Sequence, residues 1–266
     1  MNRGILEAHR TGIVTSATLL ANGPGFEEAA ALARETPALG VGVHLNLTRG
    51  RPVSRPADVP SLVGDGGAFA RTPLGLGRGG ADLRDVRREW QAQIARVVAA
   101  GVTPTHLDSE KHVHLLPALL EVAIGLAGAF GVRALRAGAE PGLLARVAPL
   151  NPQWYKGWVV GALGRRARRR VVASGRVAPD RLLGVVDGGC LDGPRLERLL
   201  RGLRPGVTEL ICHPGNDGPD LRRLLGNGGG RYGAAARAAE VRALAAAPLR
   251  DRLRRDDISL IHYGML

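Results

Sequence analysis

The chain has 266 residues, of which 45% are hydrophobic and 3% aromatic, and its formal net charge is +13. This length is enough for one large α/β domain, or for two small ones, with a substantial core. The sequence contains no run of 18 apolar residues, which argues against a membrane-spanning helix, and its start at Met1-Asn-Arg-Gly is unlike a secretory signal.

Apolar, strand-like segments alternate with helical ones along the chain. The clearest helix covers residues 83–100, where apolar residues such as Trp90 and Ile94 recur at helical spacing. Residues 49–82 are rich in Gly, Pro and Arg and are typical of a long functional or mobile loop. This alternation predicts a parallel sheet or a (β/α) barrel. The other expected elements are helices at 4–9, 26–34, 118–130, 154–174, 191–203 and 232–244 and strands at 12–20, 39–47, 102–107, 132–135, 182–187, 207–213 and 258–263.

The segment from His106 to His114, His-Leu-Asp-Ser-Glu-Lys-His-Val-His, is the richest in chemistry. It holds three of the seven histidines and two carboxylates, directly after an expected strand. Imidazoles and carboxylates bind divalent metals, and α/β folds place their chemistry at strand ends. His112 and His114 are two residues apart, so on extended backbone both would point the same way. The alternative is a solvated polar loop.

Two further expected strands also end in histidine, His44 in Gly-Val-His-Leu-Asn and His213 in Cys-His-Pro-Gly. Three strand ends that present imidazole to one rim predict an active site, although each histidine alone could be a core residue. A metal held by histidine and carboxylate activates water and polarises a carbonyl, which suits amide or ester hydrolysis. A second group must then protonate the leaving amine. His213 is our candidate catalytic residue for that step, with a hydrogen-bonded turn residue before Pro214 as the alternative.

Two polar residues near these histidines complete the candidate site. Asp108 is expected to act in catalysis by orienting a metal-bound histidine, or else simply to cap the loop. Asn46 lies two residues past His44, on the same side, and is a candidate for substrate binding. His9 and His262 have no comparable context, and we interpret them as structural.

Several segments resemble, in the same order, the YdjC-like (ChbG/HpnK) carbohydrate deacetylases. The resemblance extends to the closing segment at 258–263, and it implies a distorted (β/α) barrel of the NodB/YdjC-like type in a single domain over 1–266. It also implies a divalent metal, Mg²⁺ or Zn²⁺, and hydrolysis of the N-acetyl group of an amino sugar, in an oligosaccharide or a lipid-linked glycan. The segments that carry the resemblance are Asn2–Thr18, Gly40–Thr48, Thr105–Ser109, His112–Pro117 and Cys212–Gly215.

The resemblance assigns a role to individual residues. His44 matches a metal ligand of the family, and His213 matches its His-Pro turn. Position 110 is commonly a histidine ligand in the family and is Glu110 here, but a carboxylate can still bind a hard or borderline metal. The expected metal ligands are therefore His44, Glu110, His112 and His114.

The sequence departs from the family at its start. Family members begin with a hydrophobic strand that ends in Ala-Asp-Asp-Phe-Gly, upstream of the segment that aligns with Asn2. One of its aspartates is a catalytic base and the other a metal ligand, and neither is in this sequence. We therefore expect an N-terminally truncated barrel that lacks its first strand and has two unpaired edges. An internal GTG codon taken as the start in a GC-rich gene would explain the gap.

Three alternatives to a deacetylase remain open: another metal hydrolase such as a phosphoesterase, an inactive degenerate homologue, and a protein that associates with membrane surfaces. The last is suggested by residues 154–170, where aromatic residues precede an arginine block, as in a helix that contacts anionic lipid peripherally; a solvated basic helix has the same composition. Only Lys111 and Lys156 among the 37 basic residues are lysine. Arginine suits phosphate partners, but a GC-rich genome produces the same bias.

Other partners and the location follow from composition. We expect no nucleic-acid partner, because aromatic stacking residues are scarce. A homodimer remains open. Cys190 and Cys212 are the only cysteines, which argues against a disulfide framework and favours a cytoplasmic, reducing setting.

Overall fold

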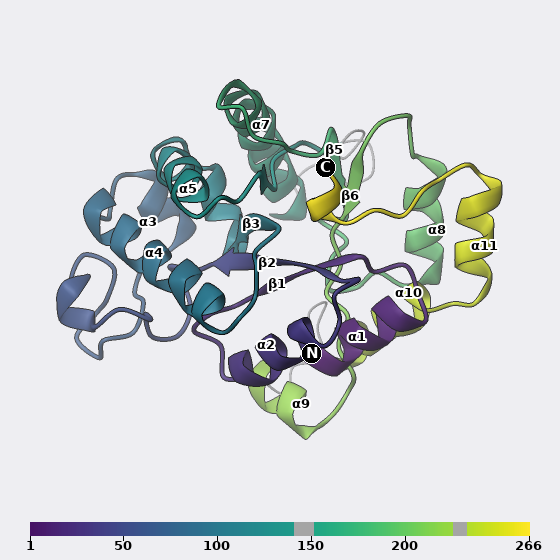
Figure 1. Cartoon of the computed structure of the whole chain (residues 1–266), viewed down its shortest axis with the longest axis horizontal. Coiled ribbons are helices and arrows are strands. Elements are labelled where there is room, and N and C mark those ends of the chain that lie inside the picture. Colours follow the sequence, from purple (N-terminus) through teal and green to yellow (C-terminus); the bar gives the residue numbers. More distant parts are fainter. Residues whose placement is uncertain (141–151, 226–232) are drawn as a thin grey trace. The chain divides into compact units, whose positions relative to one another are not determined.

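The structure is a computed structural model that describes residues 1–140, 152–225 and 233–266 (Figure 1). The chain divides into two compact units, each assembled from separate segments. Unit 1 comprises Met1–Thr15, Ala139–Val159 and Pro179–Ile261, and unit 2 comprises Ser16–Gly138, Val160–Ala178 and His262–Leu266. The expectation of one domain over 1–266 stays a prediction.

Unit 2 contains a four-stranded parallel sheet in the order β1-β2-β3-β4. In the pairing of β2 with β3, His44 lies opposite Asp108. Parallel strands direct their carboxyl ends to one edge, so this register brings the two polar side chains together there. The strands are β1 Ser16–Leu19, β2 Gly40–Leu45, β3 His106–Ser109 and β4 Ala134–Leu135.

Helix α4 (Leu83–Ala99) is the longest helix that lies wholly within unit 2, and it confirms the helix predicted at 83–100. It begins at Asp82, whose carboxylate accepts a hydrogen bond from the N–H of Arg84. Its apolar face is fully buried at Trp90 and Ile94, each contributing about 1.5–3 kcal/mol. The other helices of unit 2 are α2 Phe26–Arg34, α3 Pro73–Gly77, α5 Pro117–Ala129 and the 3₁₀ turns η1 Pro56–Asp58, η2 Glu110–Leu115 and η3 Tyr263–Met265.

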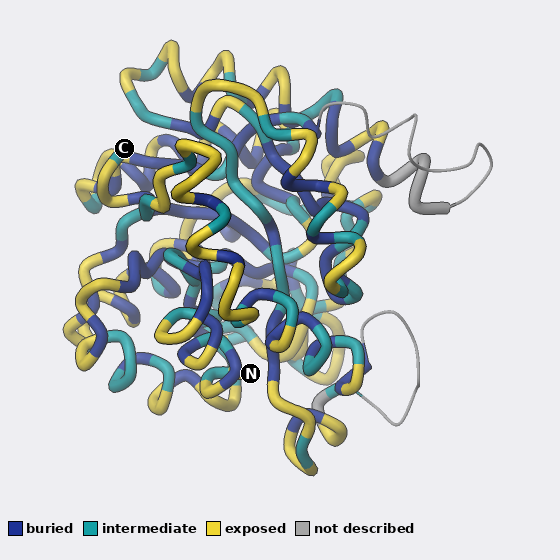
Figure 2. Tube along the Cα trace, turned by 90° about the vertical axis from the view of Figure 1, so that its right-hand side faces the viewer, coloured by how far each residue is buried: buried dark blue, intermediate teal, exposed yellow. Residues whose placement is uncertain are grey.

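Unit 1 contains a second parallel pair, β5 (Arg181–Leu183) with β6 (Thr208–Leu210). Helix α10 (Ala234–Leu244) contacts both α1 and α8. The remaining helices of unit 1 are α1 Asn2–Arg10, α8 Gly193–Arg201, α9 Pro219–Leu225 and α11 Pro248–Arg255. Buried and exposed residues alternate along the helices, as amphipathic helices require (Figure 2).

Helix α7 (Pro152–Ala173) contains the arginine block and runs through segments of both units. Its buried face includes Ala167 and Val171, while Trp158 and Val159 are about half exposed. Of its arginines, Arg170 pairs with Glu121 on α5. Contact of this helix with a membrane surface stays a prediction. None of the helices in the described part of the chain has the length and hydrophobicity that a bilayer-spanning segment needs.

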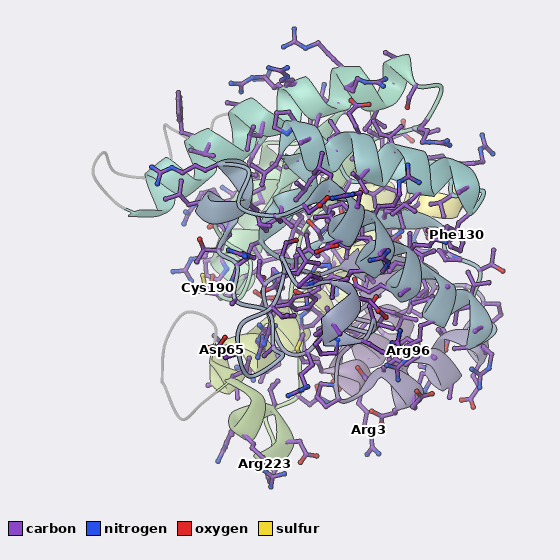
Figure 3. The ribbon with its side chains drawn as sticks, turned by 90° about the vertical axis from the view of Figure 1, so that its left-hand side faces the viewer. Arg3, Asp65, Arg96, Phe130, Cys190 and Arg223 are labelled. Atoms are coloured by element: carbon purple, nitrogen blue, oxygen red, sulfur yellow. The ribbon has the colours of Figure 1, made fainter. Side chains whose placement is uncertain are left out.

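The α/β fold with parallel strands is confirmed, whereas closure into a barrel and the absence of a first strand stay predictions. The strand predicted at 258–263 is wrong, because 258–262 has no regular structure and Tyr263 opens η3. The cause is local: Asp257 has a φ of 55°, and the His262 ring accepts the N–H of Gly264, which turns the chain. Helices α9 and α11 were not predicted. Figure 3 shows side chains such as Arg3 and Arg223 extending outward.

Candidate functional site

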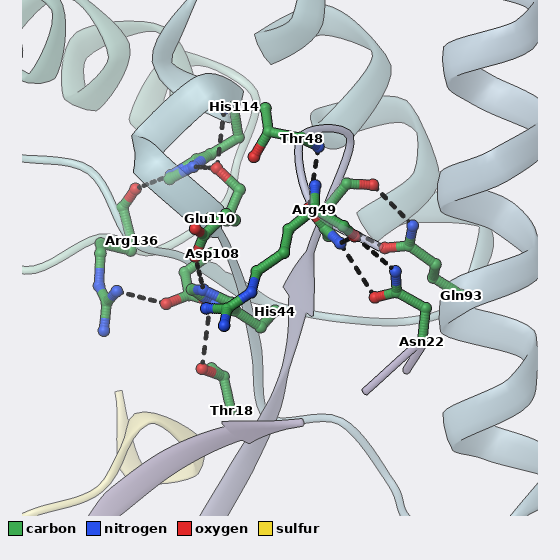
Figure 4. Close-up of polar contacts among 12 residues, drawn as sticks. Thr18, Asn22, His44, Thr48, Arg49, Gln93, Asp108, Glu110, His114 and Arg136 are labelled. Carbon is green, nitrogen blue, oxygen red and sulfur yellow. Dashed lines mark hydrogen bonds and ion pairs between the residues drawn. The ribbon is translucent and has the colours of Figure 1, made fainter. Parts of the chain in front are cut away.

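A cluster of charged side chains lies at the carboxyl ends of β2 and β3 in unit 2 (Figure 4). Nδ1 of His44 is 2.7 Å from Oδ1 of Asp108, and its Nε2 is 3.5 Å from Oε2 of Glu110. The Thr18 hydroxyl, from β1, lies 3.4 Å from the same Nδ1. The imidazole therefore bridges two carboxylates, one fully buried at Asp108 and one with 26% of its side chain exposed at Glu110.

Asp108 is fixed by a second partner, Arg136, which the sequence did not indicate. Arg136 directly follows β4, and its guanidinium pairs with Oδ2 of Asp108. Its backbone N–H donates to the carbonyl of Leu107, 2.9 Å away, so the strand order positions it. Burial opposes ionisation of Asp108, but Arg136 and His44 outweigh burial and hold the pKa of this carboxyl well below its usual range.

The charge of His44 follows from its two carboxylate neighbours. Burial alone would lower its pKa, but the charges and hydrogen bonds of Asp108 and Glu110 outweigh burial and raise the pKa of His44 to about 9. The same contact with His44 lowers the pKa of Glu110. His44 is therefore an imidazolium at neutral pH and must lose a proton before Nε2 can bind a metal.

The fit of these residues to a divalent metal is partial. Asp108 holds Nδ1 of His44 and leaves Nε2 facing Glu110, which is the carboxylate–histidine arrangement found in metal sites. His44 and Glu110 thus offer two suitable donors. Within residues 1–140, 152–225 and 233–266, no group of three or more His, Cys, Asp or Glu side chains is placed to hold a metal. The metal and its ligand set stay predictions.

The backbone between Glu110 and Leu115 is not extended, so that expectation for His112 and His114 is wrong. Lys111 and His112 have φ values of 52° and 56°, in the left-handed region, and the segment forms the 3₁₀ turn η2. Two consecutive non-glycine residues in this region are uncommon and strained, a feature that clusters at functional sites. His112 is half-buried, whereas His114 is fully buried.

Both ring nitrogens of His114 have partners. Nε2 donates to the carbonyl of Arg136 at 2.7 Å, which leaves Nδ1 to accept from the hydroxyl of Ser109 at 2.5 Å. Burial lowers the pKa of His114 to about 4, so the ring is neutral. A metal role for His114 would require one of these two hydrogen bonds to break, and it stays a prediction. His106 is a core residue by its contacts: it is buried and stacks on Tyr263, with ring centroids 3.8 Å apart.

Asn46 is fully buried, and its side-chain amide is saturated with hydrogen bonds. The amide nitrogen donates to Oδ1 of Asn22 and to the carbonyl of Arg49, at 3.0 and 2.7 Å. The amide oxygen accepts from the N–H groups of Thr48 and Arg49, at 3.0 and 3.2 Å. These contacts hold the loop that follows β2; direct substrate binding by Asn46 stays a prediction.

His213 belongs to unit 1, three residues beyond the end of β6. Its backbone N–H donates to the carboxylate of Glu240, and its carbonyl accepts from Arg237 at 3.2 Å. Sequence reasoning missed both partners. In the sequence, the signal is an Arg and a Glu three residues apart in the expected helix. In the structure both are buried on α10, at positions where apolar residues are usual. The catalytic role of His213 stays a prediction.

The fold and the site together define an α/β protein with a histidine–carboxylate cluster at the ends of parallel strands. The model of the family described as YdjC-like protein matches residues 1–255, and the chain belongs to this family. The resemblance of its sequence motifs to YdjC-like proteins is thereby confirmed.

Two curated relatives of the chain are named carbohydrate deacetylases. The chain is 51% identical over 132 residues to a carbohydrate deacetylase of Brevibacillus brevis, a match that covers 50% of this chain and 52% of the relative. It is 46% identical over 157 residues to a carbohydrate deacetylase of Geobacillus stearothermophilus, covering 58% and 62%. The chain thus spans about half the length of the first and somewhat more of the second.

A solved structure supports the fold over nearly the whole chain. The crystal structure of an Enterococcus faecalis V583 protein, named for cellobiose-phosphate cleavage, superposes with a TM-score of 0.74 at 29% identity. The match covers 99% of this chain and 92% of that protein. The order of helices and strands is therefore shared well beyond the segments that carry the histidines.

Proposed function

We propose that the chain is a metal-dependent carbohydrate deacetylase that hydrolyses the N-acetyl group of an amino sugar. The observation that carries this proposal is the His44–Asp108–Glu110 cluster at the ends of two neighbouring parallel strands. Family membership and the names of the two curated relatives support the same chemistry. The substrate is an N-acetylated oligosaccharide or lipid-linked glycan.

Each residue of the site has a role in this proposal. His44 and Glu110 supply two donors for Mg²⁺ or Zn²⁺, and Asp108 fixes the His44 ring through Nδ1. Arg136 keeps Asp108 ionised. A bound divalent metal supplies Lewis-acid polarisation of the amide carbonyl and activates water. His213 donates the proton that the leaving amine needs.

The test is acetate release from N-acetylglucosamine oligomers by the full chain, after metal removal and after addition of Mg²⁺ or Zn²⁺. We expect release to require the metal and to fall at least 100-fold in Glu110→Gln, because the charged carboxylate donor becomes a neutral amide (about 2.7 kcal/mol). The matched control is Asp65→Asn, since Asp65 is exposed and distant in sequence from the site (Figure 3).

Two outcomes would contradict the proposal. The first is no acetate release from any N-acetylated oligomer with either metal. The second is full activity in Glu110→Gln. Hydrolysis of a phosphate monoester in place of the amide would favour the phosphoesterase alternative, for which the arginine-rich composition is the only present support.

A further inference from the structure

Helix α10 forms hydrogen bonds with both the N–H and the carbonyl of His213. Nη1 of Arg237 donates to the His213 carbonyl at 3.2 Å, and Oε2 of Glu240 accepts from the His213 N–H. The carbonyl of Arg237 also accepts from the N–H of Gly215 at 3.3 Å. Three hydrogen bonds from one helix therefore fix the turn His213-Pro-Gly215.

The His213 turn lies beyond the residues that pair β6 with β5. The pairing of β5 with β6 extends to Leu210, and the N–H of Ile211 continues it with a hydrogen bond to the carbonyl of Leu183. Pro214 has no N–H to donate. The N–H and the carbonyl of His213 are instead bonded by the side chains of Glu240 and Arg237.

The loop after β5 contacts both Glu240 and the His213 ring. Oε1 of Glu240 accepts from the N–H of Leu191 at 3.0 Å, so one carboxylate ties this loop to His213. A Cβ built on Gly188 would lie 2.8 Å from both Cε1 and Nδ1 of the His213 ring. The imidazole therefore lies against the backbone of Gly188, in space that only glycine leaves open. The N–H of Gly188 donates to the carbonyl of Gly184 at 2.8 Å, which fixes the backbone that lies against the ring.

Burying Glu240 and Arg237 costs free energy unless their polar atoms form hydrogen bonds. Glu240 is fully buried and Arg237 is 8% exposed, two charged groups where apolar ones are usual. Burial raises the pKa of Glu240, while the backbone N–H donors and Arg237 act in the opposite direction. Nη1 of Arg237 and the carboxylate of Glu240 bind the backbone of the His213 turn, and Glu240 also binds the loop beside it.

We propose that Arg237, Glu240 and Gly188 are positioning residues that set the orientation of the His213 imidazole. The inference rests on the proposed function in one respect, that the His213 ring delivers a proton to the leaving amine. Their effect on the reaction is indirect, because their contacts are to the backbone and one face of the ring. Proton transfer tolerates little misplacement, since an error of about 1 Å costs roughly 100-fold in rate.

The decisive variants are Gly188→Ala and Glu240→Gln. Gly188 does not have a left-handed φ, and an added Cβ meets the His213 ring at 2.8 Å before the Gly184 carbonyl at 3.0 Å, so the methyl group acts mainly by displacing the ring. Its matched control is Gly193→Ala, where a Cβ meets no atom within 4 Å. Glu240→Gln keeps the shape of the side chain but turns an NH₂ group toward one of the two N–H donors. Exposed Glu35 supplies its control, Glu35→Gln.

We expect both variants to lower kcat for acetate release by roughly 10- to 100-fold, with KM within about twofold of wild type. The controls should leave both constants unchanged. In ¹³C-histidine-labelled protein, the ring signals of His213 should shift in Gly188→Ala and Glu240→Gln and in neither control. Amide exchange at His213 or at Leu191 should accelerate in Glu240→Gln, because the amide keeps only one acceptor oxygen for these two N–H groups.

The proposal is overturned by a wild-type kcat in Gly188→Ala, or by His213 ring signals that do not move in either variant. Should Glu240→Gln fail to fold, Gly188→Ala carries the test alone, since it removes no hydrogen bond. If the wild-type protein releases no acetate, the proposed function fails. The orientation of the ring is then still decided by the NMR signals, which need no substrate.

Discussion

Substitution of Asp108 by Asn should change the proton affinity of His44 more than any other single change in the site. Asp108 is fully buried and lies 2.7 Å from Nδ1 of His44. Asn keeps the shape and one hydrogen bond but removes the charge. Burial then becomes the dominant influence on His44, offset only by Glu110 at 3.5 Å.

The magnitude follows from the pKa of His44, which is raised from 6.5 to about 9 in the folded protein. At about 1.36 kcal/mol per pKa unit, this shift corresponds to roughly 3 kcal/mol of differential stabilisation. Because the folded-state pKa is raised, the stabilisation is fully present below pH 6.5 and is lost as the pH rises toward 9. The wild-type free energy of unfolding should fall by up to about 3 kcal/mol over this window, and Asp108→Asn should remove most of that slope.

The assay is a titration of the ¹³C-labelled His44 ring by NMR, combined with urea unfolding at pH 6 and pH 9. We expect wild-type His44 to titrate near pH 9 and the variant to titrate well below wild type, because the charge of Asp108 no longer opposes the effect of burial. Asp65→Asn is the control and should titrate as wild type does. A wild-type His44 that titrates near 6.5, or a variant that still titrates near 9, would refute the reasoning.

Three further predictions concern the metal, the loop and the core. Binding of Zn²⁺ should tighten by up to about tenfold per pH unit from pH 7 to pH 9, because His44 must first release its proton. Calorimetry in two buffers of different ionisation enthalpy measures the number of protons released on binding. Zn²⁺ binding that does not depend on pH would contradict the prediction. Glu89→Gln should lower the free energy of unfolding by about 1–3 kcal/mol in urea, because buried Glu89 accepts two backbone N–H groups at 2.9 Å. Ile94→Ala should cost about 2–5 kcal/mol in the same assay, and exposed Val98→Ala less than about 0.5 kcal/mol; equal losses would refute the assigned core face.

Long periodic elements could be predicted from the sequence and short ones could not. The helix predicted at 83–100 and the strand at 39–47 are found as α4 and β2, because their apolar patterns extend over many residues. The strand predicted at 258–263 has a suitable composition, but positive φ at Asp257 and the turn at His262 end any extension. Such turns depend on contacts with one or two atoms, which composition does not encode.

The candidate site was predictable where one strand ends in a polar residue, and not where two distant segments meet. His44 and Asp108 both follow apolar runs, and the parallel register of β2 and β3 places them opposite each other. Arg136 pairs with Asp108 from β4, and only the order of strands in the sheet shows this. The left-handed turn at Lys111 and His112 has no glycine to announce it, so the extended interpretation of that segment was wrong.

A stripe of polar residues on α4 is a sequence pattern that indicates how the loop after β2 is held. Asp85, Glu89 and Gln93 recur every four residues, beside the buried apolar face, and all three are buried. Read from sequence, they are the edge of a solvated face. In the structure they bind backbone groups of the segment after β2: Asp85 accepts from Ser61, at 3.0 Å, and Gln93 accepts from Asn46, at 2.9 Å.

This stripe holds the segment from Asn46 to Ser61, whose Gly- and Pro-rich surroundings predict a loop without such support. Glu89 holds the middle of the segment through the N–H groups of Val53 and Ser54, between the two points held by Asp85 and Gln93. A buried acceptor that binds loop N–H groups stabilises the loop, because those groups would otherwise lose their water without a partner. One helix therefore holds the first part of this loop, from Asn46 to Ser61. A polar residue repeated at helical spacing beside an apolar face is the sequence pattern by which such a support can be recognised.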